Sequence, residues 1–216
     1  MAKEMRREIK DLKEKILEMA DLAISMLDDA NTALCNRDLE LAESVDQEKH
    51  KLREYDEEIE AEALQVLGLF QPMAVDLRTL GTILKIITYL YRIGRYGKDI
   101  AAVVEMLNTE YPISELVGIR HMWEHVKPMI EDAIYCFEHR NTEKLKDFIE
   151  RDDEVDQMRW SIFRESVSWC IEDPKNITIS AHIIMIARYL ERCGDHACKI
   201  AEKVHYMVTA EHIEIS

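Results

Sequence analysis

The sequence predicts an all-α protein built from two tandem three-helix bundles. Three observations lead to this class. The chain of 216 residues is rich in helix-forming residues and holds only 6 Gly and 4 Pro, which disfavours β-sheet and alternating α/β structure. Its apolar residues recur at helical spacing, and its second half repeats the first. A chain of this length is expected to form one or two compact domains.

The first half, residues 1–110, divides into three expected helices. One runs from about residue 6 to Cys35 and ends at the turn NRD. A second continues to about Gly68, and after the turn FQPMAVD a third extends to about Asn108. Three long helices in series, joined by short turns, are typical of a bundle.

The second half, residues 111–216, repeats this order. The segment NTEYPIS connects the halves, HRNT separates the first two helices and EDPKN separates the last two. The last helix carries an apolar stripe at helical spacing, which predicts a packed face. Its members are Ile183, Ile186, Ala187, Leu190, Cys193, Ala197, Ile200, Ala201, Val204 and Met207.

An internal duplication relates the two halves. Placing Gly94 on Gly194, an offset of 100, aligns the segments YLYRIGRYGKDIAAVV and YLERCGDHACKIAEKV. Six further positions agree at this offset: Tyr89, Leu90, Arg92, Ile100, Ala101 and Val104 match Tyr189, Leu190, Arg192, Ile200, Ala201 and Val204. Upstream the offset is 103, so that Leu52, Tyr55 and Ile59 fall on Val155, Met158 and Ile162. Because a glycine inside a helix costs about 0.5–1 kcal/mol, both glycines are expected to mark close helix contacts.

The charge balance disfavours nucleic acid as a partner. The chain carries 28 basic and 43 acidic residues, a net charge of -15, which repels a phosphodiester backbone. The opening MAKEMRREIKDLKEK has no apolar signal-peptide core, and the apolar stretch ILKIITYLY is short and contains Lys85. These features predict a soluble cytoplasmic protein.

Cysteine usage agrees with a reducing compartment. The five cysteines are odd in number and show no C-x-x-C spacing, so we expect them to act as small buried hydrophobic residues. They are Cys35, Cys136, Cys170, Cys193 and Cys198.

Two pairs of acids stand out in the second half. Glu191 and Asp195 are four residues apart and therefore project from one side of the last helix, at the edge of its apolar stripe. Taken alone, they are explained by a solvated polar face. On the preceding helix, however, Asp152 stands where the next core residue is due, and Asp156 follows one turn later.

A buried carboxylate is normally ion-paired, protonated or bound to a metal. Arg159 or Arg192 could serve as the ion-pair partner. Alternatively the four acids Asp152, Asp156, Glu191 and Asp195 converge on hard cations, with oxygen ligands that suit Mg, Ca, Mn or iron. Several acids together can bridge more than one ion, so a multinuclear site is the hypothesis.

The same stretches resemble a known family. YLERCGDHACKIAEKV is similar to the E(D)-x-x-x-D signature helix of the PhoU family, and ERDDEVDQM and FQPMAVDLRTL resemble two further stretches of it, with Pro72, Asp76, Leu77 and Arg78 matching. The resemblance spans nearly the whole chain. It implies two three-helix bundles, metal clusters of divalent or trivalent ions (Fe, Mn, Zn, Mg or Ca) on the acidic motifs, and frequent homodimers. It also implies an accessory, negatively regulating role in phosphate uptake and signalling, with the ATPase of the phosphate ABC transporter and a sensor histidine kinase as partners.

The first half departs from the family pattern, because its acidic motif is replaced by basic and aromatic residues. At the equivalent positions stand Lys49, Arg53, Tyr91 and Arg95. One interpretation is loss of the metal with local repair by i,i+4 ion pairs, Arg53 with Glu57 and Arg95 with Asp99. The other is an anion site for phosphate, or for an acidic segment of a partner or second subunit, because clustered Arg, Lys and Tyr donors suit an anion.

Two competing functions remain. HMWEH, residues 121–125, matches the H-x-x-E-H motif of inverted zinc peptidases and would place His121 and His125 on one helical face. A metal-free helical adaptor is the second alternative. His196 lies beside the acid pair but points away from Asp195, so we expect it on the surface. No other catalytic motif is found, and we expect a protein that is not an enzyme.

Overall fold

The computed structural model describes residues 2–107 and 116–215, which form six long helices and two short 3-10 helices. The expected connector NTEYPIS lies outside these residues. The described part contains no strand, which confirms the predicted all-α class. The long helices are α1 (Ala2–Asn36), α2 (Leu39–Phe70), α3 (Ala74–Leu107), α4 (Val117–His139), α5 (Phe148–Glu172) and α6 (Ile177–Thr209). The short ones are η2 (Glu143–Leu145) and η3 (Pro174–Asn176).

Helix boundaries follow local backbone chemistry. Asp38 caps α2, because its carboxylate accepts a hydrogen bond from the backbone N–H of Leu41 at 3.0 Å. Gln71, Arg140 and Ala210 end α2, α4 and α6 in the left-handed region, with φ of 48°, 53° and 65°. The predicted turns therefore fall close to the observed helix ends.

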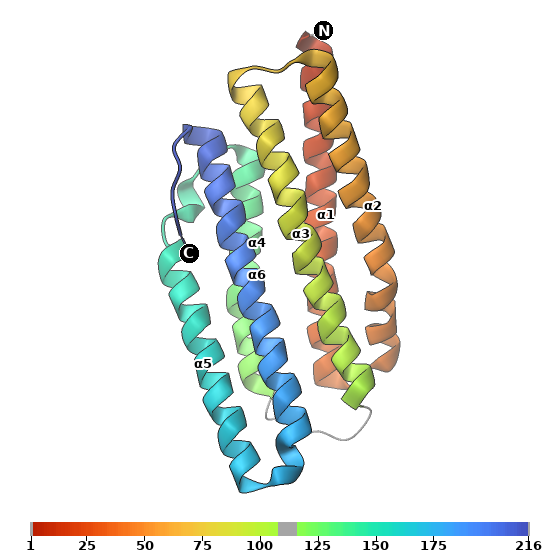
Figure 1. The fold of residues 1–216 in the computed structure, drawn as a ribbon, viewed down its shortest axis with the longest axis vertical. Helices are drawn as coiled ribbons and strands as arrows, with labels where there is room; N and C mark the ends of the chain where they lie inside the picture. The colour runs from red at the N-terminus through yellow and green to blue at the C-terminus, as the bar shows by residue number, and fades with distance from the viewer. Residues whose placement is uncertain (1, 108–115, 216) are drawn as a thin grey trace.

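The helices form two three-helix bundles that lie side by side, α1–α3 and α4–α6 (Figure 1). The bundles meet mainly through α3 and α6, and to a lesser extent through α1 and α4. The Thr82 hydroxyl on α3 donates to the carbonyl of Lys203 on α6 at 3.3 Å. Asp28 on α1 accepts from Trp123 Nε1 at 2.8 Å and from Lys127 Nζ at 2.6 Å, both on α4. The buried apolar residues consequently form one core that extends across both bundles.

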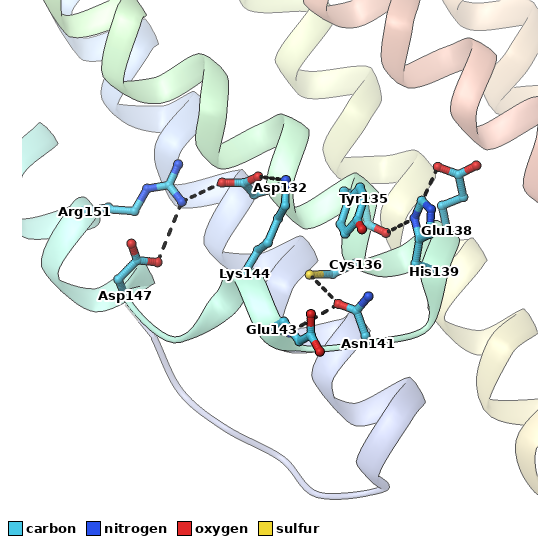
Figure 2. Close-up of polar contacts among 10 residues, drawn as sticks. All are labelled: Asp132, Tyr135, Cys136, Glu138, His139, Asn141, Glu143, Lys144, Asp147 and Arg151. Atoms are coloured by element: carbon cyan, nitrogen blue, oxygen red, sulfur yellow. Dashed lines mark hydrogen bonds and ion pairs between the residues drawn. The ribbon is translucent and has the colours of Figure 1, made fainter.

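Polar contacts fix the connection between α4 and α5 (Figure 2). The Asp132 carboxylate accepts from Lys144 Nζ at 2.8 Å and from Arg151 Nη1 at 3.0 Å, and so links α4 to both sides of the turn. Asn141 Oδ1 accepts from the Cys136 thiol at 3.4 Å. This turn sets the start of α5, the helix that carries Asp152.

The cysteines are free thiols, and Cys136, Cys193 and Cys198 are buried as expected, whereas Cys35 and Cys170 are half-buried. None of the described helices contains a stretch long and apolar enough to span a bilayer.

The glycines differ in how closely helices approach them. A Cβ on Gly94 would lie 2.5 Å from Leu52 Cδ2, which confirms a close contact between α2 and α3. A Cβ on Gly194 would meet nothing closer than Val155 Cγ1 at 3.5 Å, an ordinary contact, so the expectation of close approach is wrong there. The tightest backbone approach is at Gly97, where a Cβ would lie 2.9 Å from the backbone carbonyl of Met26 on α1.

Replacing Gly97 with alanine is expected to destabilise the protein by about 1–3 kcal/mol, because the backbone of α1 must move away from α3. Gly194→Ala is the matched control. It introduces the same methyl group where only an ordinary van der Waals contact with Val155 awaits it, and should gain about 0.5–1 kcal/mol from helix propensity. Urea denaturation of both variants measures the difference. Equal stability of the two variants would contradict the packing described for Gly97.

Candidate functional site

The two acid pairs of the second half lie on neighbouring helices, Asp152 and Asp156 on α5 and Glu191 and Asp195 on α6. Glu191 is buried, with only 7% of its surface exposed. Asp152 and Asp195 are half-buried, and Asp156 is exposed. The apolar spacing around Asp152 therefore correctly indicated a partly buried carboxylate. Glu191 is more deeply buried than its position at the edge of the apolar stripe of α6 suggested.

The acids lie close enough to perturb one another. Burial raises the pKa of Asp152, and the negative charges of Asp195 and Asp156 add to this rise. Burial also raises the pKa of Glu191, and Asp195 contributes again. The Cys198 thiol, whose own pKa is raised by burial and by Asp152, stays protonated and donates to Asp152 Oδ1 at 3.4 Å. A cation among these acids would relieve their mutual repulsion.

Three arginines surround Glu191, and we call Arg159, Arg188 and Arg192 the arginine belt. Arg188 Nη1 donates to Glu191 Oε1 at 2.8 Å, and Arg159 Nε lies 3.5 Å from the same oxygen. Arg192 Nη1 donates to Asp195 Oδ2 at 2.8 Å, and its Nε lies 3.7 Å from Glu191 Oε2. Arg159 and Arg192 are the partners that the sequence suggested, and Arg188, one turn before Glu191, was missed.

The donor set fits a hard cation by its chemistry. All four side chains offer carboxylate oxygens, and Glu191 Oε2 is buried without a hydrogen-bond partner. In the present arrangement, however, no three His, Cys, Asp or Glu side chains within residues 2–107 and 116–215 are grouped closely enough to hold a metal ion. A cation would replace the arginine belt as the counter-charge of Glu191 and Asp195. Metal binding by Asp152, Asp156, Glu191 and Asp195 therefore stays a prediction.

His196 is not on the surface as expected, because α3 packs over it. Only 8% of its surface is exposed, and its ring stacks against Tyr89 at 5.6 Å and Tyr96 at 6.0 Å between centroids. Burial, with smaller contributions from Arg92 and Arg192, lowers the pKa of His196 to about 4. The ring is therefore neutral near pH 7, and its Nε2 has no hydrogen-bond partner.

The HMWEH motif lies on α4. The rings of His121 and His125 are 4.5 Å apart edge to face, so the two histidines do share one side of the helix. Glu124 is paired with Arg120 at 3.2 Å. Across the described part of the chain, neither histidine belongs to a group of three metal-ligating side chains. Nothing in this geometry favours the zinc-peptidase alternative.

In the first half, α2 and α3 border a surface pocket of about 220 Å³ at the position equivalent to the acid site. We call it the basic pocket; it is lined by Lys49, His50, Arg53, Tyr91, Arg95 and Lys98. The structure thus brings together all four residues that the sequence selected. His50 and Lys98 were missed, although the offsets of 103 and 100 would have found them opposite Asp153 and Cys198.

The i,i+4 ion pairs of the first interpretation, loss of the metal with local repair, are not formed. Asp99 pairs with Lys98 at 3.5 Å and not with Arg95, and Arg53 is not paired with Glu57. On a helix such pairs contribute only a few tenths of a kcal/mol, so side-chain entropy and hydration are enough to leave them unmade.

Comparisons with known proteins place this geometry in a family. The family model described as PhoU domain matches residues 16–104 and 119–204, one copy in each bundle. The chain is 36% identical over 203 residues to a protein of Rhizobium meliloti named phosphate-specific transport system accessory protein PhoU homolog, covering 94% of this chain and 86% of that protein. A protein of the same name from Aquifex aeolicus is 34% identical, with coverage of 86% and 84%. The crystal structure of PhoU from Pseudomonas aeruginosa superposes with a TM-score of 0.89 at 31% identity, covering 95% of this chain and 99% of that one.

Proposed function

This chain belongs to the PhoU family, and on that premise we propose that it is an accessory protein that restrains phosphate uptake by a phosphate-specific transport system. The supporting observation is the pair of PhoU-domain matches, one over each three-helix bundle. Relatives that cover most of the chain carry the name of an accessory protein of that system. In this role the protein works by binding and not by catalysis.

The resemblance to the family also supports a cellular location, an oligomeric state and partner proteins. We place the protein in the cytoplasm as a homodimer, in contact with the ATPase of the phosphate ABC transporter and with a sensor histidine kinase. The net charge of -15 agrees with protein partners and not with nucleic acid. The long helices offer extended faces for such contacts.

The second bundle would hold the metal. We assign Asp152 and Asp156 on α5 and Glu191 and Asp195 on α6 as its ligands, because their oxygens suit a hard cation. Burial, with a smaller contribution from the neighbouring carboxylates, raises the pKa of Asp152 and Glu191, as expected where negative charge gathers away from water. When bound, the ion supplies a cross-link between two helices. When no ion is present, Arg159 on α5 pairs with Glu191 on α6, and the Cys198 thiol on α6 donates to Asp152 on α5. Arg188 and Arg192 then neutralise Glu191 and Asp195.

Deleting the gene from its host is expected to raise the uptake of radiolabelled phosphate in phosphate-rich medium, because the transporter loses its restraint. Expressing the wild-type chain should return uptake to the original rate. Expressing the variant Asp152→Asn/Glu191→Gln, which lacks two of the proposed metal ligands, in the deletion strain then tests whether the accessory role requires the metal. Unchanged uptake in the deletion strain, with transport by the system itself confirmed, would contradict the proposed function.

A further inference from the structure

The basic pocket between α2 and α3 carries the opposite charge to the equivalent site in the second bundle. Its six lining residues correspond one by one to residues around the acid site, at offsets of 103 for α2 and 100 for α3. Lys49, His50, Arg53, Tyr91 and Arg95 stand opposite five carboxylates, and Lys98 stands opposite Cys198. Among the described residues, no acid lines this pocket. The fold therefore places four cationic side chains where its duplicate concentrates negative charge.

Two of these cations are available to a ligand. Lys49 is paired with Asp46 at 2.6 Å, and Lys98 lies 3.5 Å from Asp99. Arg53 and Arg95 are exposed, and neither has a carboxylate of the described chain within 4.0 Å. They stand on different helices at the same pocket, so two guanidinium groups can approach one ligand from two sides.

The donors favour a phosphate group over other anions. A guanidinium presents N–H groups in a planar fork that matches phosphate oxygens two at a time, and lysine adds a point charge. The Tyr91 side chain, which also lines the pocket, adds a hydroxyl that donates or accepts. A volume of about 220 Å³ suits one phosphate group and its first waters more than a folded partner segment.

A second pocket of about 510 Å³ adjoins the first, because Tyr91 and Arg95 line both. Its other residues are Asp56, Thr88, Arg92, Tyr96 and Asp99. The two carboxylates balance the charges of Arg92 and Arg95, so this pocket attracts a phosphate less than the basic pocket does, and they accept hydrogen bonds from hydroxyl groups. This neighbour has room for the organic part of a phosphomonoester.

We propose that the basic pocket binds a phosphate group, with Arg53 and Arg95 as its principal ligands and Lys49, Lys98 and Tyr91 as supporting donors. The ligand is either inorganic phosphate or a small phosphomonoester that extends over Tyr91. The site lies in the first bundle and is separate from the metal ligands of the second. It does not depend on the accessory role, because binding is measured on the purified chain.

Isothermal titration of the chelator-treated protein tests this with two probes, inorganic phosphate and ribose 5-phosphate, at constant ionic strength. Arg53→Ala and Arg95→Ala are each expected to weaken binding about tenfold or more, and the double variant about a hundredfold. The matched control is Arg7→Ala/Arg164→Ala, which removes the same charge from exposed positions outside the pocket and should bind as the wild type does.

The two probes distinguish the source of the phosphate. Equal affinity for both supports free phosphate as the ligand, and tighter binding of ribose 5-phosphate supports a phosphomonoester. Absence of binding by both probes would overturn the proposal. It would also be overturned if the control variant lost as much affinity for phosphate as the double variant. The same holds if the double variant still bound phosphate but no longer formed a dimer, because these residues would then contact a second subunit. Circular dichroism melting confirms that each variant is folded.

Discussion

Adding Mn²⁺ to chelator-treated protein, at about a hundred times its dissociation constant, is expected to raise the melting temperature by about 5–10 °C. A ligand that binds only the folded state at this excess stabilises it by about 2.7 kcal/mol. For a chain of this size each kcal/mol corresponds to about 2–4 °C. The effect is expected because an ion held by Asp152 and Glu191 joins α5 to α6, two helices that are separate in the unfolded chain.

The stabilisation by metal should also depend on pH. Burial raises the pKa of Asp152 and Glu191, so the folded, metal-free protein holds protons that the unfolded chain has already released. Stability of the metal-free form therefore falls as pH rises through the interval between the unfolded and the folded pKa values. Metal binding requires the ionised carboxylates and strengthens over the same interval. The shift in melting temperature should accordingly be larger at pH 7.5 than at pH 5.

Matched variants identify the ligands. Asp152→Asn/Glu191→Gln should abolish both the shift and the metal measured by mass spectrometry in the purified protein. Glu150→Gln/Glu154→Gln, which removes two exposed acids from the same helix α5, should retain both. Mg²⁺, Ca²⁺, Fe²⁺ and Zn²⁺ are tested in parallel. A melting temperature indifferent to all five ions would contradict the metal site and would favour the metal-free adaptor.

Local sequence features determined most of the fold. Helical spacing, few glycines and clear turn signals predicted every long helix, and the duplication predicted that α2 and α3 repeat as α5 and α6. The replacement of acids by Lys49, Arg53, Tyr91 and Arg95 was also visible from the two offsets. Because both copies have the same fold, equivalent positions meet again in space, and the basic pocket follows from this.

Contacts between the bundles could not be predicted in the same way. His196 lies outside the apolar stripe of its own helix and is buried only because Tyr89 and Tyr96 of α3 cover it. Gly97 cannot carry a side chain without a shift, because the backbone of α1 packs directly against it, and no sequence pattern within α3 indicates this contact. The choice of ion-pair partners was equally hidden: Arg188, Arg192 and Arg159 all lie within 4.0 Å of Glu191, and sequence spacing alone does not rank a partner on the same helix against one on α5.

His196→Phe is expected to remove a loss of stability that the wild-type protein suffers in mild acid. The folded-state pKa of His196 is lowered to about 4, mainly by burial, while in the unfolded chain it is about 6.5. As pH falls below 6.5 the unfolded state takes up a proton that the folded state refuses, so stability is lost between pH 6.5 and 4. Between pH 7.5 and 5.0 this amounts to about 2 kcal/mol.

Phenylalanine keeps a ring against Tyr89 and Tyr96 but has no nitrogen to protonate, so the variant should lose about 2 kcal/mol less than the wild type over that interval. Urea denaturation of the chelator-treated proteins at both pH values measures the difference and keeps the metal out of the comparison. Carboxyl groups with raised pKa values stabilise the folded protein on acidification. Both proteins contain the same carboxyl groups, so this contribution cancels in the difference between them. His121→Phe, at an exposed position on α4, should follow the wild type. Parallel losses in the wild type and His196→Phe would show that this ring is hydrated and titrates freely, in contradiction to its position between α3 and α6.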